Sequence, residues 1–162
     1  MKLPIAEQAP ESRVTCRMTS AYRSDPPPQL PVLIVDDEPE IRRALQRILN
    51  RTCAVSMCAN GAEAWQRFVN GEKYDAILCD LLMPEMTGMD LFRALVREYP
   101  DQAERLLLIT GGATSETTRM FIAKHANRVV SKPFKPVEVA VRTMARFPMP
   151  FPALSMMPAA GS

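Results

Sequence analysis

Residues 32–38 read Val-Leu-Ile-Val-Asp-Asp-Glu, a short apolar run that ends in three consecutive acids. The run has the length of a strand buried on both faces, and Pro31 and the acids bound it. Pro39 is well placed for the first turn of a helix, and five apolar residues then follow at helical spacing: Ile41, Ala44, Leu45, Ile48 and Leu49. The stretch therefore predicts a buried strand that leads directly into a helix, with acids at the junction.

The same pattern of a strand followed by a helix recurs along the chain. Further strands are expected at Cys53–Cys58, Ala76–Cys79, Leu106–Ile109 and Arg128–Ser131. The expected helices carry Ala64, Trp65, Phe68 and Val69, then Leu91, Phe92, Leu95 and Val96, then span Ser115–Lys124, and last carry Val137, Ala140, Val141 and Met144. Five such units with apolar strands predict an α/β fold, a doubly wound five-stranded parallel sheet with helices on both faces.

The prolines mark the boundaries of this domain within the 162 residues. Ten of the 15 prolines fall outside residues 32–147. We interpret residues 1–30 as a flexible proline-rich arm, 31–147 as the folded domain, and 148–162 as a tail rich in proline and methionine. A frayed end is the favoured interpretation of the tail, and docking of its apolar side chains on a partner is the alternative.

Composition excludes several classes of protein. A formal charge of +2 argues against a general nucleic-acid binder, which needs a concentrated basic face. No apolar run has the length of a transmembrane helix, and the first residues lack the apolar segment of a secretion signal. The four cysteines lack the spacing of a zinc site. We therefore expect a cytoplasmic protein with reduced thiols and with neither nucleic acid nor membrane as a partner.

Polar residues follow the expected strands at the points where ligands bind in such sheets. Asp36 and Asp37 follow the first strand, Asp80 the third, Thr110 and two glycines the fourth, and Lys132 the fifth. The three aspartates carry about −3 together, and close carboxylates raise one another's pKa unless a cation compensates. Mg²⁺ together with Lys132 would neutralise them. Asp37 alone could instead cap the helix at Pro39, but Asp36 is explained only by the cluster.

These residues are similar to those of a known family. The segment 32–38, the segment Asp80-Leu-Leu-Met-Pro-Glu-Met-Thr-Gly88, Thr110 and Lys132-Pro-Phe134 together resemble the receiver domain of two-component response regulators. The likeness covers residues 31–147. It implies a flavodoxin-like sheet with strand order 2-1-3-4-5. The Thr110-Gly-Gly stretch also resembles receivers attached to hybrid kinases, which suggests a role in a phosphorelay.

The resemblance assigns a role to each acid. It implies that Asp80 accepts a phosphoryl group. It further implies that Mg²⁺ is held directly by Asp37 and Asp80, through water by Asp36, and by the backbone carbonyl of Leu82. A carboxylate is a competent nucleophile, and a metal ion can neutralise the charge of a phosphoryl group during transfer.

The resemblance also assigns roles to residues after the fourth and fifth strands. It implies that Thr110 is a switch hydroxyl that moves to the phosphoryl group, and that Lys132 supplies an ammonium to pair with it. Gly111 and Gly112 carry no side chain that would block the donor. Receivers typically have a cis peptide bond after this lysine, which makes Pro133 a candidate cis-proline.

Two positions depart from the pattern of the family. Val129 stands where receivers commonly carry an aromatic switch residue, so we expect another way of transmitting the signal. We expect the output face to include Val129, an outward-pointing Val139 and Arg142. Leu82 stands where a polar side chain could position water, which predicts slow self-dephosphorylation.

The predicted function is a phosphoacceptor receiver that signals by protein–protein contact and is not an enzyme. The expected donor is a histidine kinase or a phosphotransfer protein, and the downstream partner is an unidentified protein. One alternative is an interaction module that keeps the fold without phosphorylation. The other is a phosphatase that forms an aspartyl-phosphate, which needs a second acid where Leu82 stands. No output module is expected after residue 147, and the lone His125 is expected to be a solvated loop residue.

Overall fold

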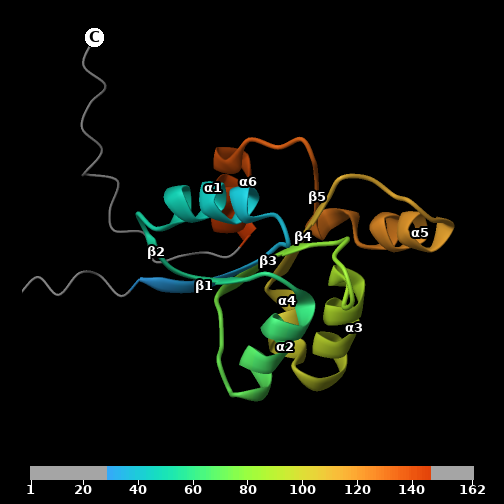
Figure 1. Cartoon of the computed structure of the whole chain (residues 1–162), viewed down its shortest axis with the longest axis horizontal. Helices are drawn as coiled ribbons and strands as arrows, with labels where there is room; N and C mark the ends of the chain where they lie inside the picture. The colour runs from blue at the N-terminus through green and yellow to red at the C-terminus, as the bar shows by residue number, and fades with distance from the viewer. Residues whose placement is uncertain (1–28, 147–162) are drawn as a thin grey trace, which may run out of the picture.

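The computed structural model of the chain describes residues 29–146. Residues 1–28 and 147–162, which include the predicted tail and nearly all of the predicted arm, lie outside the described residues. Figure 1 shows the arrangement of the elements, which are β1 (Leu30–Val35), α1 (Pro39–Leu49), β2 (Cys53–Cys58), α2 (Gly61–Val69), β3 (Ala76–Asp80), α3 (Gly88–Glu98), α4 (Pro100–Glu104), β4 (Leu106–Thr110), α5 (Glu116–Lys124), a 3₁₀ turn (Ala126–Arg128), β5 (Val129–Ser131) and α6 (Pro136–Arg146).

The five strands form one parallel sheet in the order β2-β1-β3-β4-β5. This confirms the expected fold class and strand order. In the register of the sheet, Val35 of β1 pairs with both Cys58 of β2 and Cys79 of β3. The chain moves outward from β1 to β2 on one side and to β3 on the other, so the strand order switches at the carboxyl end of β1.

Helices cover both faces of the sheet. Figure 1 shows α1 and α6 on one side and α2, α3 and α4 on the other, with α5 near the ends of β4 and β5. Alternate residues of β1 enter the two cores, because successive side chains of a strand point to opposite faces: Val32 and Ile34 lie on the α1 and α6 side, Leu33 and Val35 on the other. None of the helices within residues 29–146 is long and apolar enough to cross a membrane.

Local hydrogen bonds define where three of the helices begin. The Thr87 hydroxyl accepts from the Asp90 amide while the Asp90 carboxylate accepts from the Thr87 amide, which is a complete capping box at α3. Asn60 and Ser115 cap α2 and α5 with their side chains. In contrast, α1 begins at Pro39 with no side-chain cap. The alternative that Asp37 caps this helix is therefore wrong.

Gly88 allows α3 to start against the end of β3. A Cβ atom at this position would lie 2.4 Å from the carbonyl oxygen of Asp80 and 2.9 Å from the Cα of Leu81. Both neighbours are backbone atoms, so they cannot move aside easily. The glycine thus fixes the distance between α3 and the strand that carries Asp80.

The last helix buries a different face from the one predicted. Val139 is fully buried and lies in the core beside α1, whereas Val137 and Val141 are 59% and 58% exposed. Thr143 is also fully buried, because its hydroxyl donates to the carbonyl of Val139 at 2.7 Å and needs no water. The apolar pattern misled the prediction because a satisfied threonine takes a core position that was assigned to valines.

The expected output face changes as a consequence. Val139 does not point to solvent, and Val129 is only 8% exposed and packs in the core on the α2 and α3 side. Arg142 is half-buried and donates to the carbonyl of Val129 at 3.3 Å. The prediction that these residues form an exposed apolar contact is wrong, since two of them are core residues and Arg142 ties α6 to β5.

The boundaries of two other segments differ from the prediction. The short helix α4 was not expected, because its five residues, Pro-Asp-Gln-Ala-Glu, are too few and too polar to show a helical period. The fifth strand begins at Val129, one residue later than predicted, because Arg128 belongs to the 3₁₀ turn before it.

Candidate functional site

The predicted site residues of the central strands meet at one edge of the sheet. Asp36 comes one residue after the paired Val35, and Asp80 one residue after its partner Cys79, so the two acids leave adjacent strands side by side. On the other side of β3, Thr110 ends β4 opposite Ser131, and Lys132 is the next residue. The register of the parallel sheet, rather than nearness in sequence, therefore collects these groups.

The Lys132 ammonium lies among three carboxylates. Its Nζ atom is 3.6 Å from Asp36 Oδ2, 3.5 Å from Asp80 Oδ1 and 3.2 Å from Glu38 Oε1. The Lys132 side chain is 18% exposed, so these ion pairs are shielded from bulk water more than surface pairs are. The lysine consequently connects the ends of β1, β3 and β5.

The two oxygens of Asp36 have different surroundings. Oδ1 accepts a hydrogen bond from the Glu38 amide at 2.8 Å, which holds the turn between β1 and α1. Oδ2 is buried and has no hydrogen-bond partner, and no other buried side-chain nitrogen or oxygen in residues 29–146 lacks one. A buried oxygen in this state is costly unless a cation satisfies it.

The pKa values follow from burial and from these contacts. Burial, the largest cause, and the neighbouring Asp36 charge together raise the pKa of Asp80 to about 6, while Lys132 opposes both. Burial likewise raises the pKa of Asp36 against the hydrogen bond from the Glu38 amide. Burial lowers the pKa of Lys132, but Asp36 and Asp80 outweigh this and the pKa is raised. The lysine thus stays charged, and one cation does not fully compensate the acids.

The acids also fit a divalent metal ion. Asp36, Asp37 and Glu38 can each offer a carboxylate oxygen, and these oxygens all lie within 4.8 Å of one another. These acids, which include Asp36 with its Oδ2 atom that accepts no hydrogen bond, form a set of oxygen donors with excess negative charge, which is what Mg²⁺ binds. Asp37 is exposed, so waters can complete such a coordination shell. The acids present therefore fit a divalent ion such as Mg²⁺, but the third acid of this cluster is Glu38, whereas the sequence predicted Asp80.

Thr110 is held by its own loop. Its side chain is buried, and its hydroxyl both donates to the Gly112 carbonyl and accepts from the Gly112 amide, each at 3.1 Å. Gly112 has φ of +131°, a conformation that favours glycine. Gly111 is exposed beside the lysine, and a Cβ atom there would meet only Lys132 Cδ, at 3.9 Å. The surface next to the ammonium is therefore open.

The remaining predicted residues flank the site. The Lys132–Pro133 peptide bond is cis, the geometry that the resemblance implied. Leu82 is half-buried two residues after Asp80, and its carbonyl is still only a predicted ligand. His125 differs from the expected solvated residue. It follows directly after α5 and lies against the rings of Phe92 and Phe121, with ring centroids 4.9 Å and 4.6 Å away.

Sequence reasoning missed two contributors to the site. Glu38 was treated only as part of the acidic run, yet its carboxylate pairs with Lys132. Arg42 donates from its guanidinium to the backbone carbonyl of Asp36 at 2.5 Å. The available signal was the position of Arg42, four residues after Glu38. Residues four apart lie on the same side of a helix, so the Arg42 side chain can reach back to the acids at the start of α1.

The family of the chain follows from comparison with known sequences. The family model of the response regulator receiver domain matches residues 32–143. The transcriptional regulatory protein SrrA of Staphylococcus aureus (strain NCTC 8325 / PS 47) is 36% identical over 115 residues, which cover 70% of this chain and 46% of that protein. The chain belongs to the response regulator receiver family of two-component signalling, and it spans about half the length of the curated relatives it matches.

Solved structures agree with this assignment. A CheY-like receiver domain protein from Methanospirillum hungatei JF-1 matches 74% of this chain and 94% of its own with a TM-score of 0.64 at 23% identity, which shows the fold alone. The chemotaxis protein CheY4 of Vibrio cholerae matches with a TM-score of 0.59 at 28% identity, covering 74% of this chain and 98% of its own.

Proposed function

We propose that this receiver takes a phosphoryl group from a phosphohistidine onto Asp80 and passes the signal on by protein–protein contact. The observation that carries the proposal is the position of Asp80 at the carboxyl end of β3, with Lys132 Nζ 3.5 Å from its Oδ1 atom. The proposed donor is a histidine kinase or a phosphotransfer protein. The proposed cofactor is Mg²⁺, held by Asp37, Asp80 and the Leu82 carbonyl, and through water by Asp36.

The proposed reaction uses the residues of the site as follows. An oxygen of the ionised Asp80 carboxylate attacks phosphorus, the bond between phosphorus and the histidine nitrogen breaks, and the imidazole leaves with its electron pair. With a pKa of about 6, Asp80 is mainly ionised at neutral pH. Lys132 lies where it can pair with the incoming phosphoryl oxygens. When bound, Mg²⁺ neutralises charge on the transferring group.

Leaving the loop contact at Gly112 would let Thr110 respond to the phosphoryl group. Its hydroxyl now bonds only with backbone atoms two residues away. Exchanging those bonds for one to a phosphoryl oxygen would move the loop that joins β4 to α5, because Gly112 is bonded through both its amide and its carbonyl. We propose this exchange as the first step of the output.

The test is labelling of the full chain with acetyl phosphate in Mg²⁺ and in excess EDTA. We expect label that requires Mg²⁺ and is released by hydroxylamine, as an acyl-phosphate is. Label that survives hydroxylamine, or no label with acetyl phosphate or a phosphohistidine donor, would favour an interaction module that works without phosphorylation. Sustained release of phosphate from phosphomonoesters would favour the phosphatase.

A further inference from the structure

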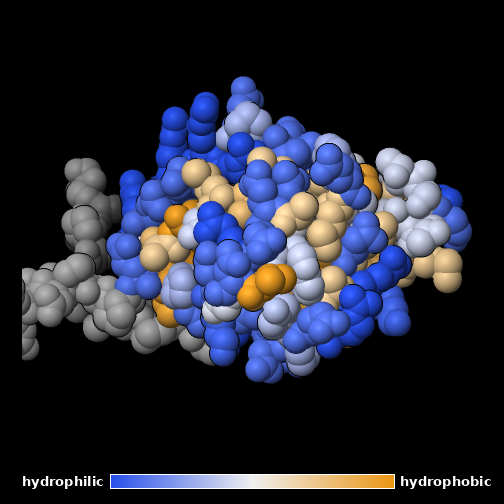
Figure 2. Space-filling model, turned by 60° about the horizontal axis from the view of Figure 1, so that its bottom comes forward, coloured by the Kyte–Doolittle hydropathy of each residue, from blue (hydrophilic) through white to orange (hydrophobic). Residues whose placement is uncertain are grey.

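A groove lies between α3 and α5, and none of the residues of the acidic site line it. Its volume is about 670 Å³, and residues of both helices line it. Figure 2, turned so that the α2 and α3 side comes forward, shows a face that is largely hydrophilic, with apolar residues in small separate patches. A groove between two helices with apolar residues along it is the kind of feature that binds a partner.

The inside of the groove is aromatic and apolar. Phe92 of α3 and Phe121 of α5 meet edge to face, with ring centroids 5.7 Å apart. Val96 and Met120 also line the groove and are 50% and 66% exposed, which makes them two of the five large apolar side chains exposed among residues 29–146. The groove therefore has exposed apolar side chains beside two buried rings, and an extended peptide could lie along it.

The edge of the groove is positively charged. Arg93 and Lys124 line it, and no aspartate or glutamate is among the residues that line it within the described part of the chain. The guanidinium of Arg93 lies 5.8 Å from the centroid of the Phe121 ring, so the charge is held directly over the apolar floor. Its ion pair with Asp90 is long, at 3.9 Å, and both side chains are at least half exposed.

His125 lies close to the positive charges of this part of the surface. It lines the groove and contacts both phenylalanine rings. Burial lowers its pKa, and the charges of Arg128 and Lys124 lower it further. The groove thus combines an apolar floor with a basic edge, and among residues 29–146 the only acid that pairs with this edge is Asp90, at 3.9 Å from Arg93.

We propose that the groove between α3 and α5 is a docking site for an acidic peptide segment of a partner protein. Apolar side chains of the segment rest on Phe92, Phe121 and Met120, and its carboxylates pair with Arg93 and Lys124. Charge complementarity favours this occupant over the chain's own residues 147–162, which carry no charged side chain.

The test begins with selection from a random short-peptide library on the immobilised full chain. Enriched peptides should carry several acids around two or three large apolar residues. Labelled copies are then titrated by fluorescence anisotropy. Met120→Asp should weaken binding by roughly tenfold or more, since it replaces an exposed apolar contact with a carboxylate that repels the acids of the peptide. Val141→Asp is the matched control, because Val141 is similarly exposed on α6, and it should bind as the wild type does.

A charge swap keeps the test decisive if Met120→Asp folds poorly. The double variant Arg93→Glu with Lys124→Glu should no longer bind the acidic peptides. It should instead bind versions of the same peptides in which lysine replaces each aspartate and glutamate. The proposal is overturned if no peptide is enriched, if enriched peptides lack acids, or if they bind the groove variants as well as the wild type. It is also overturned if a synthetic peptide of residues 147–162, or self-association of the chain, occupies the groove instead.

Discussion

At the scale of single residues, the site concentrates more negative charge than its one lysine can balance. Asp36 and Asp80 are both almost fully buried, and Lys132 lies within 3.6 Å of each. Burial and repulsion from neighbouring carboxylates raise the pKa of both acids, which means that the ionised, metal-free site destabilises the fold. A neutral side chain at either position would make the fold more stable. The two carboxylates are therefore explained by a role in binding or chemistry and not by stability.

This imbalance predicts how Asp80→Asn changes stability without metal. Unfolded Asp80 ionises near its ordinary pKa of 3.8 and the folded residue near about 6, so the folded state holds more protons in between and stability falls as pH rises through that window. A difference of about 2 pKa units corresponds to roughly 3 kcal/mol. In EDTA at about pH 7.5 we expect the variant to be more stable by on the order of 2–3 kcal/mol, and at about pH 4 the gain should nearly vanish.

Urea unfolding of the full chain at both pH values measures this difference. Glu104→Gln changes an exposed acid and should give no such dependence on pH. Added Mg²⁺ should narrow the gap by stabilising the wild type selectively. An Asp80→Asn variant less stable than the wild type at the higher pH would show that the carboxylate is compensated after all.

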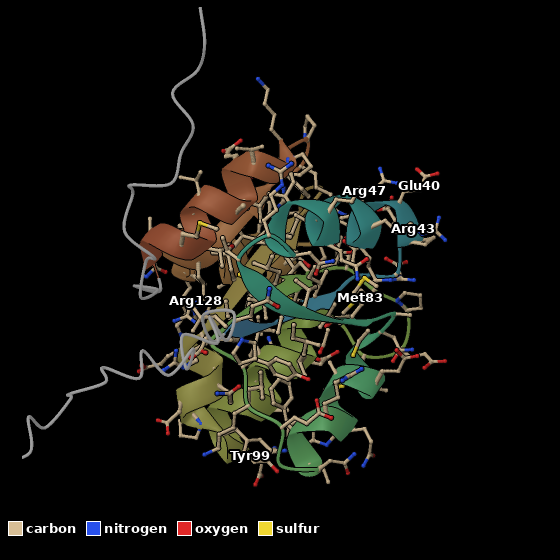
Figure 3. All side chains as sticks on the ribbon, turned by 90° about the vertical axis from the view of Figure 1, so that its left-hand side faces the viewer. Glu40, Arg43, Arg47, Met83, Tyr99 and Arg128 are labelled. Atoms are coloured by element: carbon tan, nitrogen blue, oxygen red, sulfur yellow. The ribbon has the colours of Figure 1, made fainter. Side chains whose placement is uncertain are left out.

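The metal assignment predicts an order among the acids after β1. Removing a group that acts on a metal through water commonly costs about 10–100-fold in affinity, and removing a direct ligand costs more. Asp37→Ala should therefore raise the Mg²⁺ concentration needed for half-maximal labelling more than Asp36→Ala does. Glu40→Ala is the control, since Figure 3 shows Glu40 on α1 pointing outward with Arg43 and Arg47. Equal responses of Asp37→Ala and Glu40→Ala would refute the assignment.

At the scale of elements, α6 shows how a helix face is set by contacts rather than by hydropathy alone. The helix packs on α1 and the sheet through Val139 and Ala140, and it leaves Val137 and Val141 in water. Thr143 joins the buried face because its hydroxyl is satisfied within the helix. Two exposed valines are tolerable on a surface helix, whereas an unsatisfied polar group in the core is not.

This packing predicts opposite results for one substitution at two positions of α6. Val139→Asp should destabilise the fold by about 3 kcal/mol or more, because a carboxylate would replace an apolar side chain in the core. Val141→Asp should change stability by no more than about 0.5 kcal/mol. Thermal unfolding of the two variants side by side gives the comparison. Similar midpoints would mean that the face of α6 buried here is not the one buried in solution.

At the scale of the whole molecule, the sheet and the residues at its strand ends were predictable from the sequence. Contacts between side chains of distant segments, and the groove between two helices, were not. The sheet followed from its apolar strands, and the residues at the strand ends pointed to the site because parallel strands end at one edge. The pairing of Glu38 with Lys132 was missed, because it joins residues 94 positions apart through a flexible side chain. The groove between α3 and α5 arises only where two helices meet at a particular separation, and neither helix alone signals it.

The most direct test of the account is the intact mass of the full chain after incubation with acetyl phosphate and Mg²⁺. The wild type should gain a single phosphoryl group, and fragmentation should place it on Asp80. Asp80→Asn should gain none while it keeps the circular dichroism and cooperative unfolding of a folded receiver. Undiminished phosphorylation of Asp80→Asn, or a phosphoryl group located on another residue, would contradict the central claim that Asp80 is the acceptor.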